Sequence, residues 1–97
     1  MTAPDSLEPV YSPDASKQLD RLEDDPSQGA LWEAVVDAID LICDAPTSAE
    51  ARRGALRTPN GQTVWKVPVR CHIPDEDWVV LWQPRDKDAL IAYIGPL

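Results

Sequence analysis

The stretch GQTVWKVPVRCHIPDEDWVVLWQPRDKDALIAYIGPL, residues 61–97, contains the strongest fold signal of this chain. Its apolar residues either alternate with polar ones or run together over a few positions, which is typical of β-strands. Strands are predicted over residues 62–69, 78–82 and 89–95. Asn60-Gly61 is a strong hairpin turn signal ahead of the first strand, and Pro84–Asp88 predicts the turn before the last. The middle segment is almost entirely apolar, so we expect a central strand with both faces at least partly covered.

A short strand and two helices are predicted ahead of this cluster. Residues 7–11 contain a proline that cannot donate to a ladder, so they predict a strand at a sheet edge. Ser12 is a favoured N-cap and Pro13 suits the first helical position, which predicts a helix ending near Glu23. Residues 26–44 show the clearest helical period, with apolar residues at steps of three and four.

The charge of −8 is distributed unevenly. Residues 1–50 carry twelve acidic residues against Lys17 and Arg21, whereas residues 51–97 carry seven basic residues against five acidic ones. This asymmetry allows a locally basic face on an acidic protein, although the overall sign disfavours strong nucleic-acid binding. The basic segment 51–57 fits either a strand or a turn. The acidic row of the second helix is interpreted as a solvated face, and its alternative role is docking of a basic partner.

The length of 97 residues predicts a single domain spanning 1–97, with residues 1–6 expected to be flexible. Four tryptophans and no phenylalanine place much of the core volume in indole rings. Cys43, Cys71 and the single histidine lack the spacing of a zinc site, so we expect no metal, no cofactor and no disulfide. The sequence shows neither a membrane span nor a signal peptide, which predicts a cytoplasmic protein.

The order of strand, two helices and then three or four strands resembles the RelE/ParE superfamily of toxins from type II toxin–antitoxin systems. The resemblance covers about residues 8–95. The resemblance rests on an aromatic residue and a serine before the first helix, the apolar face of that helix, the end of the second helix and the later strands. In this sequence they are Tyr11-Ser12-Pro13-Asp14-Ala15, Leu19, Leu22, Asp44-Ala45-Pro46, Trp65-Lys66-Val67, 78–82 and 89–95.

The resemblance implies an α+β fold in which an N-terminal strand and a two-helix hairpin accompany a curved, mainly antiparallel sheet of four to five strands. It also implies a RelE-like toxin that inhibits translation by ribosome-dependent mRNA cleavage, as an endoribonuclease without a cofactor. Its partners would be a cognate antitoxin, the ribosome and mRNA. Such cleavage needs positive charge around a crowded phosphate and groups that move protons.

The resemblance implies that basic residues and one tyrosine near the end of the chain carry out this chemistry. The catalytic candidates are Lys66, Arg70, Arg85 and Tyr93. The RNA-binding candidates are Arg52, Arg53 and Arg57. His72 is the one side chain that ordinarily titrates near neutrality, although it lies toward a predicted loop.

Two other functions fit the same pattern. A ParE-like inhibitor of DNA gyrase would need none of the nuclease residues. A catalytically degenerate toxin-fold protein would act through protein binding alone, and the acidic overall charge favours that hypothesis.

Overall fold

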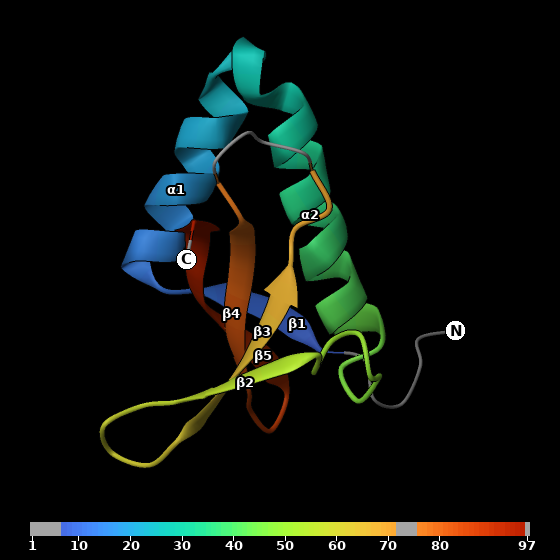
Figure 1. The fold of residues 1–97 in the computed structure, drawn as a ribbon, viewed down its shortest axis with the longest axis vertical. Helices are drawn as coiled ribbons and strands as arrows, with labels where there is room; N and C mark the ends of the chain where they lie inside the picture. Colours follow the sequence, from blue (N-terminus) through green and yellow to red (C-terminus); the bar gives the residue numbers. More distant parts are fainter. Residues whose placement is uncertain (1–6, 72–75, 97) are drawn as a thin grey trace.

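The computed structural model describes residues 7–71 and 76–96, and these residues form two helices and a five-stranded mixed sheet (Figure 1). The elements are β1 (Glu8–Tyr11), α1 (Pro13–Asp24), the 3-10 helix η1 (Pro26–Gln28), α2 (Gly29–Asp44), β2 (Gly54–Arg57), β3 (Thr63–Pro68), β4 (Trp78–Pro84) and β5 (Asp88–Pro96). The α+β class predicted from the sequence is therefore confirmed. Residues 1–6, for which flexibility was expected, lie outside the described residues.

The predicted start of the first helix is confirmed in detail. The Ser12 hydroxyl accepts a hydrogen bond from the backbone N–H of Ala15 and donates one to the carbonyl of Ala92. Ser12 therefore caps α1 and also fastens it to β5. The second helical segment begins at Pro26 as expected, but its first turn is the 3-10 helix η1. In the ambiguous segment 51–57, only the part from Gly54 onward is a strand.

The strands lie in the order β1-β5-β4-β3-β2. β1 pairs parallel with β5, and the other neighbouring strands are antiparallel. The nearly continuous apolar segment becomes β4 at the centre of the sheet, as its composition predicts. The short, mostly exposed strands β1 and β2 form the two edges.

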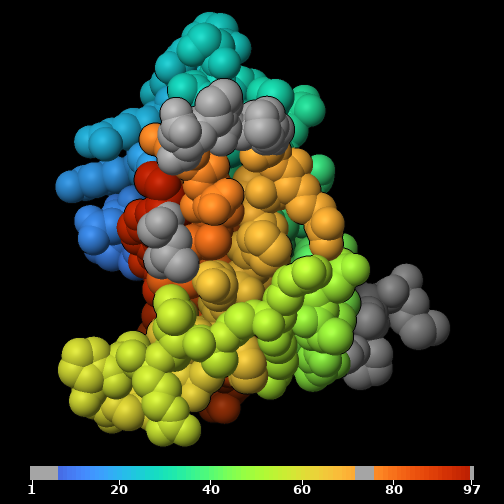
Figure 2. Space-filling view, in the orientation of Figure 1, coloured from blue at the N-terminus to red at the C-terminus, as the bar shows by residue number. Residues whose placement is uncertain are grey.

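The helices pack on one face of the sheet, and the core lies between these two layers. β4 contributes Val80 and Trp82, which are completely buried, while α2 contributes Val35 and Ile42. The indole N–H of Trp82 donates to the carbonyl of Ala51 at 2.8 Å, so the buried ring has its hydrogen bond. In Figure 2, β2, β3 and β4 lie across the front, with α1 and α2 at the margins. Among the described residues no helix covers this side of the sheet, which we call the helix-free face.

Candidate functional site

A row of residues crosses the helix-free face at the middle of the sheet. Gly54 on β2 pairs with Lys66 on β3, Lys66 pairs with Leu81 on β4, and Leu81 pairs with Tyr93 on β5. Residues next to Lys66 and Leu81, such as Val67, point to the helix-covered core, and side chains alternate along a strand. Lys66 and Tyr93 therefore share the open face, two strands apart.

Lys66 extends over Gly54, toward the β2 edge of the sheet. A Cβ atom placed on Gly54 would lie 2.8 Å from Cε of Lys66 and 3.7 Å from its Nζ. The absence of a side chain at Gly54 therefore creates the space in which this half-buried lysine lies. The ammonium is directed across β2, away from Leu81.

Tyr93 is directed along its own strand toward the end of β5. Its hydroxyl donates to the carbonyl of Pro96 at 2.6 Å, and its ring lies so close to Gly95 that a Cβ there would be 2.8 Å from the hydroxyl oxygen. With strands about 4.8 Å apart, the backbones of Lys66 and Tyr93 are roughly 10 Å apart. The two side chains border the same surface without pointing at one another.

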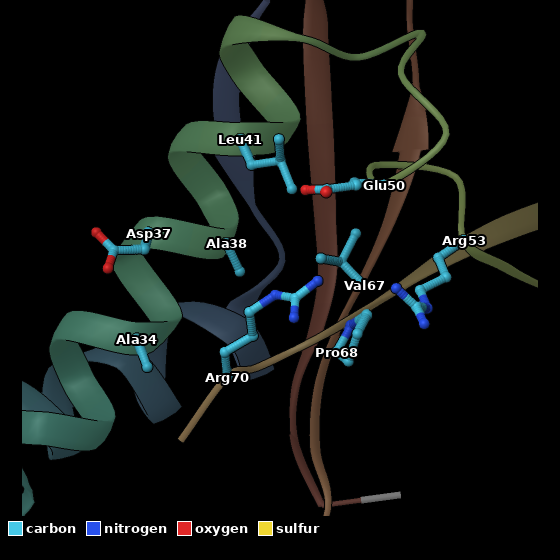
Figure 3. Close-up of a pocket in the computed structure, with 9 residues that line it drawn as sticks. All are labelled: Ala34, Asp37, Ala38, Leu41, Glu50, Arg53, Val67, Pro68 and Arg70. Carbon is cyan, nitrogen blue, oxygen red and sulfur yellow. The ribbon is translucent and has the colours of Figure 1, made fainter. Parts of the chain in front are cut away.

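The other two catalytic candidates lie at opposite ends of the sheet. Arg85 lies in the turn between β4 and β5, its side chain is 53% exposed, and its Nε is 4.0 Å from Asp88 Oδ1. Arg70 follows β3 at the other end and lines a pocket against α2, together with Ala38 and Val67 (Figure 3). The structure therefore does not gather the four catalytic candidates into one cluster.

The three arginines of the basic segment have three different environments. Arg52 donates from Nε to the carbonyl of Pro46 at 2.8 Å, and its guanidinium carbon lies 5.2 Å from the ring centre of Trp65. Arg53 lines the pocket that contains Arg70. Arg57 is exposed at the end of β2. Arg52 thus joins the loop to the core, whereas Arg53 and Arg57 present their charge to the surroundings.

Two basic residues that the sequence interpretation did not select lie beside Tyr93. Lys17 and Arg21 on α1 line a groove with Tyr93, and its volume is about 270 Å³. Their spacing of four residues places them on one side of a helix. They are also the two basic residues within the acidic stretch 1–50. Their isolated positive charge was the sequence signal that could have identified them. Asp14, at the start of the same helix, is another residue of this groove.

The histidine and the two cysteines are the remaining candidates for chemistry. His72 lies outside the described residues. Cys43 and Cys71 are free thiols. Burial first, and then the charges of Asp40 and Asp44, raise the pKa of the Cys43 thiol to about 11. Among residues 7–71 and 76–96, no cluster of three or more His, Cys, Asp or Glu side chains could hold a metal ion, and no helix in that part of the chain is long and apolar enough to cross a membrane.

No family model, curated protein or solved structure matches this chain. The helix-free face offers Lys66 and Tyr93 in one row, with Lys17 and Arg21 adjoining Tyr93. This arrangement provides one cation and one hydroxyl in the row and two further cations beside it on α1. Such positive charge suits a phosphate group better than a small neutral ligand.

Proposed function

We propose that this chain is the toxin of a type II toxin–antitoxin system, of the RelE-like kind, and that it inhibits translation by cleaving mRNA on the ribosome. The observation that carries the proposal is the placement of Lys66 and Tyr93 in one row of the helix-free face. The order of elements, a strand and a helical hairpin before four strands, supports it. A cognate antitoxin would be its protein partner, and its site of action would be cytoplasmic.

The proposed reaction needs positive charge, correct positioning of the RNA strand and proton transfer. A ribose 2′-hydroxyl attacks the adjacent phosphate and gives its proton to water. The bond to the 5′ oxygen breaks, that oxygen takes a proton from water, and a 2′,3′-cyclic phosphate and a 5′-hydroxyl remain. Lys66 supplies positive charge to the phosphate as negative charge grows on its oxygens. Tyr93, Lys17 and Arg21 hold the RNA strand alongside, with Tyr93 offering a ring on which a base stacks. Arg85 and Arg57 are exposed cations for more distant phosphates.

Induction in a bacterial host tests the proposal. The unmutated chain should stop growth, and primer extension should show new mRNA ends in translated regions. Lys66→Ala should relieve the arrest, whereas Lys87→Ala, which removes a lysine from the exposed turn between β4 and β5, should not. Equal toxicity of both variants, or arrest without mRNA ends, would contradict the proposed role of Lys66. Inhibition of gyrase supercoiling by the purified chain would instead indicate a ParE-like function.

A second candidate function follows from the dispersion of the catalytic candidates. The Tyr93 hydroxyl is bonded to Pro96, and Arg85 lies near Asp88. Arg70 lies against α2 rather than on the open face. A toxin-fold protein that acts through protein binding alone needs no convergence of these groups. For this function we expect no growth arrest on induction and a stable complex with the product of a neighbouring gene, measured by co-purification.

A further inference from the structure

A pocket opens between α2 and the edge of β3, on the side of the molecule that carries the helices (Figure 3). Its volume is about 230 Å³. That is below the roughly 300–1,000 Å³ of pockets for drug-sized ligands, so the space suits one side chain rather than a cofactor. Ala34, Ala38, Leu41, Val67 and Pro68 form its apolar lining. An aliphatic side chain is the group that this lining favours.

The pocket is open because β2 is shorter than β3. β2 begins at Gly54, which pairs with Lys66. On the β2 side of β3, no described strand therefore lies beside Val67 and Pro68. The backbone of Arg52 turns away instead and donates to the carbonyl of Ser48. The small side chains of Ala34 and Ala38 leave room on the α2 side. Strand length and helix composition together therefore create the pocket.

Charged groups are arranged around this lining with opposite signs at its two ends. Figure 3 shows the guanidinium of Arg70 reaching in between α2 and Val67, with that of Arg53 beside Pro68. The carboxylate of Glu50 points in from the other end, near Leu41, and that of Asp37 points away. Among the described residues the one ion pair joins Arg85 to Asp88, and no described residue pairs with the guanidinium group of Arg53 or Arg70.

We propose that this pocket binds the C-terminal residue of a partner polypeptide when that residue has an aliphatic side chain. The terminal carboxylate pairs with Arg53 and Arg70, since guanidinium groups recognise carboxylates through paired N–H donors. The aliphatic side chain lies on the alanines of α2 and on Val67. The amide N–H of the same residue donates to Glu50. An apolar group, a carboxylate and an N–H occur together in that residue, and they match the three parts of the pocket.

Lys66 lies on the opposite face of the sheet, so this binding does not depend on the proposed RNA site. N-acetyl-L-leucine is the minimal probe, because it contains the amide, the side chain and the carboxylate and nothing else. In a titration of the full 15N-labelled chain followed by NMR, we expect it to shift the amide signals of Ala34, Ala38, Val67 and Arg70 with a millimolar Kd. N-acetyl-L-leucinamide, which lacks the carboxylate, should bind at least tenfold more weakly, and N-acetylglycine likewise.

Variants then test each part of the pocket. Arg70→Ala and Arg53→Ala, both at exposed positions, should each weaken N-acetyl-L-leucine binding about tenfold, while Lys66→Ala leaves it unchanged. Ala34→Met, which fills the space from α2, should abolish it without loss of the folded spectrum. Equal binding of acid and amide, or no shift at tens of millimolar, would overturn the proposal. Tighter binding of free L-leucine than of its N-acetyl form would replace the peptide terminus with an amino acid as the ligand.

Discussion

Replacement of Arg52 distinguishes a structural arginine from an RNA-binding one. The guanidinium donates from Nε to the Pro46 carbonyl at 2.8 Å, and its central carbon lies 5.2 and 5.9 Å from the ring centres of Trp65 and Trp82. These contacts join the loop after α2 to β3 and β4. If they are the function of Arg52, then Arg52→Ala should destabilise the fold even when no RNA is present.

The size of the effect follows from these contacts. A hydrogen bond from a charged donor contributes about 1.5–3 kcal/mol, and a cation–π contact of a half-exposed pair adds about 0.5–1 kcal/mol. Arg52 is only partly buried, so water replaces some of what is lost, and we expect the free energy of unfolding to fall by about 2 kcal/mol. For a domain of this size, that corresponds to a fall in Tm of about 10 °C.

Urea unfolding followed by tryptophan fluorescence measures this change, because Trp65 and Trp82 are themselves the contacts. Arg52→Lys keeps the charge but loses the planar donor group, so it should still cost about 1 kcal/mol. Arg57→Ala is the matched control at an exposed position and should stay within about 0.5 kcal/mol. If Arg52→Ala also stays within that range while the toxicity of the folded variant falls, the structural role assigned to Arg52 is wrong.

Three further predictions concern other parts of the structure. Gly54→Ala should displace the side chain of Lys66, which would lie 2.8 Å from the new methyl group, and should lower toxicity as Lys66→Ala does while unfolding changes by less than about 1 kcal/mol. Burial raises the pKa of the Cys43 thiol from 9.0 to about 11, so the folded state favours the protonated thiol. The free energy of unfolding, measured with urea, should therefore fall as pH rises from 9 to 11, and it should fall less in Cys43→Ala. Trp82→Phe leaves the buried carbonyl of Ala51 without its donor and should lower the free energy of unfolding by about 1–3 kcal/mol. Trp32→Phe removes an indole N–H that has no partner among the described residues, so it should lower that free energy less. Thermal unfolding of both variants measures the difference.

Much of the fold could be read from local patterns. Ser12 and Pro13 predicted the start of α1, the three- and four-residue steps predicted α2, and Asn60-Gly61 predicted the β2–β3 turn. Each of these signals acts within a few residues of the chain, where backbone geometry and capping decide the outcome. The segment 51–57 was ambiguous because its strand depends on pairing with β3, which is a contact between separate segments.

The candidate functional site was harder to predict from the sequence than the fold. Basic residues could be recognised, but nothing local distinguishes Arg52, which packs on two indole rings, from Arg57, which faces solvent. The register of β3, β4 and β5 placed Lys66 and Tyr93 in one row, and the position of α1 brought Lys17 beside Tyr93. A side chain's charge is fixed by its chemistry, whereas its neighbours are fixed by how strands pair and helices pack.

The sequence alone therefore determined that the chain forms an α+β domain with an apolar central strand, and that positive charge is concentrated after residue 50. The positions of these charges depend on the three-dimensional fold. Lys66 lies on the helix-free face, Arg52 packs against the core, and Arg53 and Arg70 line a pocket beside α2. The physical reason is the alternation of side chains across a sheet, which makes the face of each residue depend on the register of the whole sheet.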